Sequence, residues 1–364
     1  MVKYTIATLG SHSALDVCNG ARQEGIANLV VAQRGREKTY LSYYKTRKRS
    51  GKPVGCVDEV VLVNKFSEMI NSNVISHLKK RNAIFVPNRS FAVYVGYDNI
   101  EKNFHIPIFG NRHLLRAEER NAQNNQYDLL KKANINAPCI ISTPEKIDQL
   151  AVIKVNEAKR KYERAFFVAS SYDEYLAKSQ KLIANGKITE ADLKKAQIEE
   201  FVIGAHFNFN FFYSPLHEEL ELLGIDMRRQ TTLDGYLRMP ADIQLEALKS
   251  REPNNIEVGH VACTVRESLL EDVFTQAEKF VATVQKEYAP GIIGPFALQG
   301  AIEERDGKEQ FTTFDVSFRM PGSPGTRFTP YSHYLFGEGI SFGRRIAIEL
   351  NDAIKMKKIE KIIT

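Results

Sequence analysis

Near its start the chain reads Tyr4-Thr5-Ile6-Ala7-Thr8-Leu9-Gly10-Ser11-His12-Ser13. The β-prone residues Tyr4–Leu9 predict a strand, and Ala14–Glu24 has the spacing of a helix. Gly10 lets the backbone turn between the two and approach a ligand closely. Because amide groups at the start of a helix attract anions, the turn suits a phosphate, with His12 as a further donor. A polar residue that only caps the helix explains the turn equally well.

The same alternation continues through the first third of the chain. Leu29–Ala32, Val60–Val63 and Ala83–Val86 are short and β-prone, and Phe66–Lys80 has helical spacing. Ile106–Phe109 extends the series. Strands that alternate with helices indicate a parallel sheet covered by helices, the arrangement of an α/β protein.

The rest of the chain predicts a second set of elements. Leu114–Lys132 reads as one long polar helix. Aromatic residues alternate with Asn208 and Asn210, as in a strand with one polar face. Gly294–Glu303 and Phe311–Phe318 predict a hairpin. Further strands are expected at 151–155, 165–169, 197–203 and 220–225, and further helices at 171–185, 187–195, 265–286 and 337–356.

Length and composition narrow the class of protein. A chain of 364 residues is long enough for two or three packed domains. No apolar run reaches the length of a membrane span, and the N-terminus lacks the pattern of a signal peptide. The sequence therefore predicts a cytoplasmic protein without a membrane partner.

Part of the formal net charge of +6 lies in Lys38–Lys52, where Lys45, Arg47, Lys48 and Arg49 are close together. Such a run binds nucleic acid in some proteins. A solvated loop is the better explanation, so no nucleic-acid partner is expected.

The cysteines and histidines give no sign of a zinc or iron–sulfur site. Four cysteines lie far apart and without ligand spacing, at positions 18, 56, 139 and 263. We expect four reduced and mostly buried thiols. His12, His206, His260 and His333 form no local metal motif either.

Two further polar segments follow predicted strands of the first sheet. Pro87-Asn88-Arg89-Ser90 follows Ala83–Val86, and Gly110-Asn111-Arg112 follows Ile106–Phe109. Arg89 and Ser90 can bind a phosphate, although a plain turn with an exposed arginine fits as well. Three polar strand exits on one sheet edge favour an anionic ligand of nucleotide size.

A lysine and an acidic pair mark a second group of candidates. Lys154 ends an apolar strand and needs an anion such as ATP phosphate, unless its amine reaches solvent. Glu199 and Glu200 precede Phe201 and Val202, and a strand edge beside a carboxylate can read adenine and ribose. A solvated acidic pair at a strand end is the alternative.

Gln299 and Asp315 fall on the two strands of the predicted hairpin. On one face they would offer two oxygen atoms, and Mg²⁺ usually takes one or two from a protein. Asp315 in an aromatic strand otherwise needs a partner, and Arg319 is the nearest candidate. The residues alone leave the metal site and the ion pair equally supported.

These pieces occur together in one family. The segments that carry the resemblance are Thr8-Leu9-Gly10-Ser11-His12, Phe109-Gly110-Asn111-Arg112, Glu199-Glu200-Phe201-Val202-Ile203-Gly204, Phe212-Tyr213-Ser214-Pro215-Leu216, Arg266-Glu267-Ser268-Leu269-Leu270 and Gly291-Ile292-Ile293-Gly294-Pro295-Phe296. From about Tyr4 to its end, the chain resembles the archaeal formate-dependent ATP-grasp ligases of purine biosynthesis. Those enzymes make 5-formaminoimidazole-4-carboxamide ribonucleotide from its amino precursor, formate and ATP.

The resemblance implies an ATP-grasp fold of the α/β (α+β) class with an N-terminal Rossmann-like parallel-sheet domain. Its divisions are 1–115 for that domain, 116–204 for the small ATP-grasp subdomain and 205–364 for the C-terminal subdomain. It implies a carbon–nitrogen ligase of IMP biosynthesis that works through formyl phosphate. It also implies a homo-oligomer, a trimer or hexamer.

The resemblance also assigns site residues. The ribonucleotide would contact His12, Ser90, Arg89 and His260, with His12 or His260 taking the amine proton. ATP would contact Lys154, Glu199, Glu200, Phe201, Val202, Asn208 and Gln230. Mg²⁺ would be held by Gln299 and Asp315.

The chain departs from the family at several of these positions. His260 replaces an asparagine, and Asp315 and Gln230 each replace a glutamate. Residues 155–164 contain no glycine where the family has a glycine-rich loop over the phosphates. A basic loop can hold phosphates by charge, or ATP binding is altered or lost. Two alternatives therefore stay open: a ligase for another acid and amine, and a non-catalytic nucleotide-binding paralogue.

Overall fold

The computed structural model describes residues 3–120, 122–155, 165–251, 253 and 255–364. A four-stranded sheet comes first in the chain, with strand order β5-β2-β1-β6. All of its neighbouring strands are parallel, as predicted, so their carboxyl ends meet at one edge. The strands are β1 (Thr5–Leu9), β2 (Ala27–Gln33), β5 (Glu59–Val63) and β6 (Ala83–Val86).

Helices cover both faces of this sheet because successive strand residues point to opposite sides. On one face Leu9, Leu29 and Phe85 pack against α2 (Ser72–Lys80) and α3 (Arg89–Val95). The predicted helix Phe66–Lys80 is a 3-10 turn, Phe66–Ile70, followed by α2. On the other face Ile6 and Ile84 pack against α1 (Ala14–Gln23) and the C-terminal helix α12 (Phe342–Met356).

Two segments next to the first sheet differ from their predictions of a loop and a strand. The basic segment carries a π-helix, Thr39–Tyr43, and an exposed hairpin of β3 (Arg47–Arg49) and β4 (Lys52–Val54). Ile106–Phe109 does not form a strand. Its backbone bonds to Phe85 instead, after α4 (Tyr97–Lys102).

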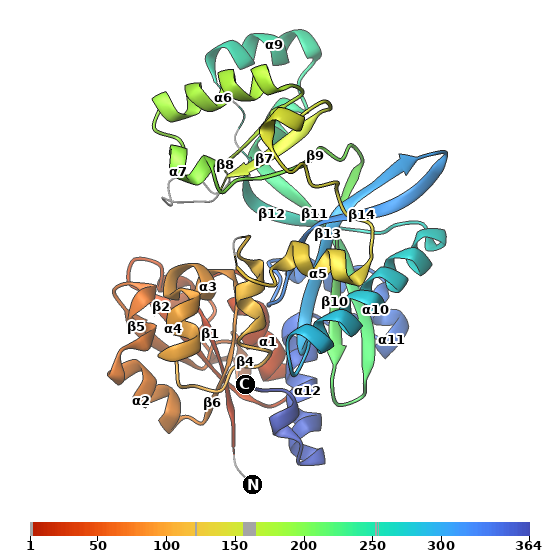
Figure 1. Ribbon diagram of the computed structural model, residues 1–364. Coiled ribbons are helices and arrows are strands. Elements are labelled where there is room, and N and C mark those ends of the chain that lie inside the picture. The colour runs from red at the N-terminus through yellow and green to blue at the C-terminus, as the bar shows by residue number, and fades with distance from the viewer. Residues whose placement is uncertain (1–2, 121, 156–164, 252, 254) are drawn as a thin grey trace.

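A three-stranded antiparallel sheet, β8-β7-β9, follows. Its strands are β7 (Ala151–Val155) and β8 (Ala165–Ala169), which have the predicted bounds, and β9 (Gln197–Glu200), which is shorter than the predicted 197–203. The helices α6 (Tyr172–Ala184) and α7 (Glu190–Leu193) lie between β8 and β9 in sequence. Figure 1 shows this sheet with α6 at the top and the parallel sheet at the lower left.

The predicted helix Leu114–Lys132 is wrong as a single element. A 3-10 turn, Leu114–Glu118, is separate from α5 (Gln126–Ala133). Asn125 starts α5 because its side chain accepts the amides of Tyr127 and Asp128 in a capping box.

The largest sheet is antiparallel, with strand order β12-β11-β10-β13-β14. The predicted hairpin is confirmed as β13 (Gly294–Arg305) and β14 (Lys308–Ser317). Phenylalanines of this sheet pack against α10 (Leu270–Glu287), which begins later than expected. The other elements are β10 (Ala205–Ser214), β11 (Glu219–Thr232), α8 (Leu233–Tyr236), α9 (Ala241–Ser250), β12 (Asn255–Cys263) and α11 (Tyr331–Phe336).

The end of the chain returns to the first sheet. Gly20 of α1 and Gly343 of α12 touch backbone to backbone, since a Cβ at Gly20 would lie 2.1 Å from the Gly343 carbonyl carbon. The predicted helix 337–356 begins only at Phe342, where Ser341 caps it. The last helix therefore covers one face of the first sheet. The predicted domain boundaries at 115 and 204 stay a prediction.

Two expectations from composition can be compared with the structure. No helix in the described part of the chain is long and apolar enough to cross a bilayer. The four cysteines are free. Cys18 and Cys56 are buried, Cys263 is half-buried and Cys139 is exposed, so burial was predicted correctly for only part of them.

Candidate active site

A central pocket of about 610 Å³ lies between the three-stranded sheet, the largest sheet and the helices that follow β6. Its walls come from β7, β9, β11, β13 and β14 and from the start of α3. Eight of the predicted site residues line it: Arg89, Lys154, Glu199, Glu200, Phe201, Val202, Gln299 and Asp315. Segments far apart in the sequence therefore share one cavity.

Lys154 lies on the inner wall of this pocket. Its Nζ forms an ion pair with Glu199 and donates to the carbonyl oxygen of Phe314 at 3.2 Å. Only 14% of its side chain is exposed, so the alternative of an amine in solvent is wrong. Burial lowers the pKa of Lys154 and raises the pKa of Glu199, although each charge opposes the shift of the other.

Glu199 also carries a buried oxygen, Oε2, that has no hydrogen-bond partner among the described residues. An unsatisfied buried acceptor is costly and marks a place for a ligand or water. Its neighbour Glu200 is engaged with the protein, since it pairs with Arg305 at 2.7 Å. The strand ends there, and Phe201 and Val202 continue along the pocket. The predicted solvated acidic pair is therefore wrong for Glu199.

Gln299 and Asp315 stand directly opposite each other on β13 and β14. Gln299 Oε1 accepts a hydrogen bond from Arg228. Arg319, which was the alternative partner considered for Asp315, forms an ion pair with Glu118 at 3.1 Å. Among the described residues no group of three or more His, Cys, Asp or Glu side chains could hold a metal ion. Two adjacent oxygen donors remain, as expected for a site that shares its metal with a phosphate.

The first two strand exits meet at the carboxyl edge of the parallel sheet. Ser11 and Ser90 share a hydrogen bond of 2.6 Å between their hydroxyls. Asn88 donates to the carbonyl oxygens of Leu9 at 2.9 Å and His12 at 3.3 Å. A plain turn was the alternative for this segment, but Asn88 caps α3 by accepting the backbone amide of Phe91. Ser90 is buried, and Arg89 faces the central pocket.

The third strand exit has a structural role, contrary to the prediction. Asn111 is buried and donates to the carbonyl oxygens of Tyr288 and Gly291. The guanidinium of Arg112 donates to four backbone carbonyls, those of Ile100, Phe104, Ile106 and Thr364. The Arg112 contact with Thr364 ties the end of the chain to this region, and neither Asn111 nor Arg112 lines the central pocket.

His260 lies in a network that the sequence did not reveal. Its Nδ1 contacts Asp226, and its Nε2 lies 2.9 Å from Glu257 Oε1. Glu257 also pairs with Arg228 at 3.1 Å. Burial alone would lower the pKa of His260, but the two carboxylates overcome it and raise the pKa to about 9. The ring is therefore a cation at neutral pH.

His12 shares this region but has the opposite electrostatics. Burial lowers its pKa, and nearby Arg319 and Arg89 add to that effect while Glu257 opposes it. Its ring lies close to Gly322. A Cβ placed on Gly322 would lie 3.2 Å from His12 Nδ1 and 3.3 Å from His260 Nε2. His12 and His260 thus meet at one point, the first neutral and the second charged.

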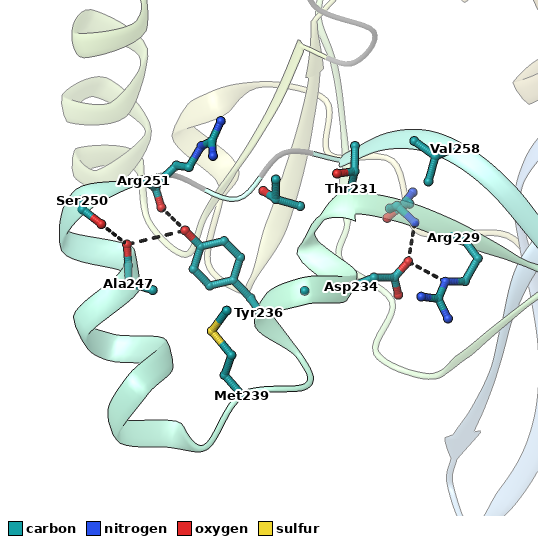
Figure 2. Close-up of a pocket in the computed structure, with 12 residues that line it drawn as sticks. Arg229, Thr231, Asp234, Tyr236, Met239, Ala247, Ser250, Arg251 and Val258 are labelled. Atoms are coloured by element: carbon teal, nitrogen blue, oxygen red, sulfur yellow. Dashed lines mark hydrogen bonds and ion pairs between the residues drawn. The ribbon is translucent and has the colours of Figure 1, made fainter.

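Two predicted ATP contacts lie outside the central pocket. Asn208 is buried and donates to Asp226 at 2.9 Å. Gln230 lines a separate pocket of about 500 Å³ with Arg229, Tyr236 and Arg251. Figure 2 shows Asp234 in this pocket, where it binds Arg229 and the amide of Gln230.

Gln230 lies at an irregularity of the largest sheet. Residues 228–230 of β11 pair consecutively, but the register against β12 shifts between Arg229 and Gln230 because Val258 of β12 is skipped in the pairing. Gln230 lines the smaller pocket with Arg229 and Val258, whereas Arg228 lines the central pocket.

Sequence reasoning missed Asp226, Arg228 and Glu257. Asp226 is an acid at the end of the apolar run Leu222–Ile225 and is buried, so it needs hydrogen-bond donors. That signal was available, because the same logic selected Asp315. Arg228 and Glu257 carried no local signal, since β11–β12 pairing joins them across the chain.

Comparisons with known proteins agree with this geometry. A domain of unknown function, DUF1297, matches residues 174–364, and a protein family of unknown function, DUF1246, matches residues 6–141. A 5-formaminoimidazole-4-carboxamide-1-(β)-D-ribofuranosyl 5′-monophosphate synthetase of Methanopyrus kandleri is 38% identical over 99% of this chain and 95% of its own. The enzyme of that name from Methanocaldococcus jannaschii is 36% identical over the same shares.

Solved structures agree as well. An IMP biosynthesis protein, PurP, of Thermococcus kodakaraensis has a TM-score of 0.71 and 28% identity, over 99% of this chain and 100% of its own. An N5-carboxyaminoimidazole synthetase of Staphylococcus aureus complexed with ADP has a TM-score of 0.56, over 93% and 79% of the two chains. At 11% identity it supports the fold alone. The ATP-grasp fold is thus confirmed, and the chain belongs to the 5-formaminoimidazole-4-carboxamide ribonucleotide synthetase family of ATP-dependent ligases.

Proposed function

We propose that this protein joins formate to the amine of 5-aminoimidazole-4-carboxamide ribonucleotide at the expense of ATP. One observation carries the proposal. Lys154, Gln299 and Asp315 line a single pocket, and polar contacts run from Gln299 through Arg228 and Glu257 to His260, beside His12. In this proposal these contacts link the ATP end of the site to the ribonucleotide end.

The ATP end is the wall formed by Lys154 and Glu199–Val202. Lys154 offers a buried cation to phosphate oxygens, where charge is worth more than in water. The unsatisfied Glu199 Oε2 can accept a donor of ATP. The glycine-free segment 156–164, which would cover the phosphates, lies outside the described residues. Asn208 and Gln230 keep no direct ATP contact in this proposal.

The oxygens of Gln299 and Asp315 fit Mg²⁺ held together with ATP. They are hard donors, paired across β13 and β14, and Mg²⁺ completes its shell with phosphate and water. A bound ion would take the place of the hydrogen bond from Arg228 to Gln299. When bound, the metal supplies positive charge to the transferring phosphoryl group.

The chemistry follows in two balanced steps. A formate oxygen attacks the γ-phosphorus of ATP, the bond to the β-γ bridging oxygen breaks, and ADP and formyl phosphate form. The amine nitrogen then attacks the formyl carbon, phosphate leaves, and the amine proton passes to a base. Lys154 and Arg228 can offset the charge on the phosphoryl oxygens.

His12 fits the role of that base and His260 does not. His260 presents both ring nitrogens to carboxylates and is a cation at neutral pH, so it has no lone pair to accept a proton. Burial keeps His12 neutral, which leaves one ring nitrogen as an acceptor. Ser90, next to Ser11, and Arg89 would hold the ribonucleotide at the sheet edge.

The test is isotope transfer. Purified protein with ATP, Mg²⁺, ¹³C-formate and the aminoimidazole ribonucleotide should yield a ¹³C-formylated ribonucleotide with one ADP and one phosphate each. Absence of labelled product and of ADP formation would overturn the proposal. The Asp315→Ala variant is the control for contaminating ligases.

A second candidate is a ligase of the same mechanism for another acid and amine. It is favoured by His260 and Glu257, which put charge beside the ribonucleotide position. ADP formation with acetate or glycine, but not with formate, would select it. By analogy we also propose a trimer or hexamer, which sedimentation equilibrium of the full chain tests.

A further inference from the structure

Glu257 is a charged group in the site with no assigned role. Its Oε1 lies 2.9 Å from His260 Nε2, and its Oε2 lies 3.1 Å from Arg228 Nε. Burial opposes its ionisation, but the hydrogen bond to His260 and the charge of Arg228 lower the pKa to about 2. Glu257 is therefore a carboxylate at neutral pH.

His260 itself cannot read the substrate. Both of its ring nitrogens are used by Asp226 and Glu257, and 12% of its side chain is exposed. Asp226 is further inside, with 1% of its side chain exposed, and is held by Asn208 and Asn210. The outermost member of the chain Asp226–His260–Glu257 is Glu257, at 19%.

His12 and Glu257 both lie close to Gly322. A Cβ on this residue would lie 3.2 Å from His12 Nδ1 and 3.7 Å from Glu257 Oε1. A group hydrogen-bonded to His12 near this point is consequently within reach of Glu257 as well. An ionised carboxylate only accepts hydrogen bonds, so the group must carry N–H or O–H.

We propose that Glu257 accepts one N–H of the attacking amine while His12 takes the other proton, so that Glu257 selects a primary amine as acceptor. This inference rests on the proposed function, in which His12 is the base. His260 and Arg228 then act as positioning residues, because they hold the two oxygens of Glu257. The resemblance implies that the family has an uncharged asparagine at position 260, which contacts the ribonucleotide. In this chain position 260 is a histidine, and the proposed contact comes from the carboxylate of Glu257.

The experiment compares steady-state kinetics of wild type, Glu257→Ala, Glu257→Gln and His260→Asn. Loss of a hydrogen bond to a charged group predicts a KM for the ribonucleotide about 10- to 100-fold higher in Glu257→Ala. The KM for ATP should change less than the KM for the ribonucleotide, and formate-dependent ADP formation should continue. His260→Asn keeps the carboxylate and should raise the ribonucleotide KM less than Glu257→Ala does. Glu246→Ala, which removes an exposed glutamate paired with Lys249, is the matched control.

The outcomes separate the two proposals. Formylation by wild type with an unchanged ribonucleotide KM in Glu257→Ala overturns the role of Glu257 and leaves the function intact. No formylation by wild type overturns the function first. Equal rises of all KM values in Glu257→Ala and His260→Asn, with equal losses of melting temperature, indicate a structural role and also reject the inference. If Glu257→Ala does not fold, calorimetric titration of the isosteric Glu257→Gln with the ribonucleotide decides, and an affinity equal to wild type rejects the contact.

Discussion

Lys154 and Glu199 are diagonal neighbours on one face of β7 and β9, where they form a buried ion pair at the wall of the central pocket. Their side chains are 14% and 2% exposed. Each charge is costly without the other, because burial lowers the pKa of the lysine and raises that of the glutamate. The ion pair keeps a positive charge in the mostly buried wall of the pocket, where it can bind a phosphate.

The first prediction concerns this pair. Glu199→Gln leaves the ammonium of Lys154 without its counter-charge and should lower the free energy of unfolding by about 3–5 kcal/mol. Lys154→Met should cost a similar amount and abolish ATP binding. The double variant should be less destabilised than the sum of the two, because it leaves no unpaired buried charge. Urea denaturation measures the cycle, and strict additivity would mean that the pair does not interact.

The second prediction concerns the pH dependence of catalysis. A base must be deprotonated to act, and burial lowers the pKa of His12 below its ordinary value of 6.5. The kcat/KM for the ribonucleotide should therefore be flat above about pH 6.5 and fall only at more acidic pH.

The variant His12→Asn should lower formylation about 10²- to 10⁴-fold and lose the acid limb of the profile. Formate-dependent ADP formation should continue, because the first step needs no base. Equal loss of both activities would contradict the assignment of His12 as base.

The third prediction concerns stability and His260. Its pKa is raised from 6.5 to about 9 in the folded protein. The stabilisation is complete below pH 6.5 and is lost as the pH rises through 9. The free energy of unfolding of wild type should exceed that of His260→Asn most at pH 6. The difference should shrink by about 2–3 kcal/mol by pH 9.5. The exposed His105→Asn serves as the control, and a pH-independent difference would contradict the cation.

The strands were predictable because their signal is local. Ala83–Val86 is a short continuous apolar run, Thr5–Leu9 is β-prone and fully buried, and phenylalanines alternate with asparagines in the first part of β10. Leu114–Lys132 failed for a local reason as well. Its composition is helical throughout, but the Asn125 capping box starts a separate helix. Capping outweighs average propensity at such a position.

A site residue could be predicted when it stood out within its own strand. It could not be predicted when its position depended on how two strands pair. Lys154, Gln299 and Asp315 stand out as polar residues in apolar strands. The partners of His260 come from β11 and β12, whose pairing is set by the whole sheet. A one-residue bulge in β12 lies opposite Gln230, which lines the smaller pocket, and no local pattern predicted this irregularity.

The fourth prediction concerns the metal. Asp315→Asn removes the only formal charge from the proposed donor pair, so the Mg²⁺ concentration for half-maximal activity should rise about tenfold or more. Gln299→Ala removes the other oxygen and frees Arg228, with a similar effect. Asp306→Asn is the matched control, because Asp306 is an exposed residue in the turn of the same β13–β14 hairpin. Chelation with EDTA should stop formylation by wild type, and added Mg²⁺ should restore it. Since Asn and Asp have the same shape, an unchanged Mg²⁺ requirement in Asp315→Asn would place the ion elsewhere in the pocket.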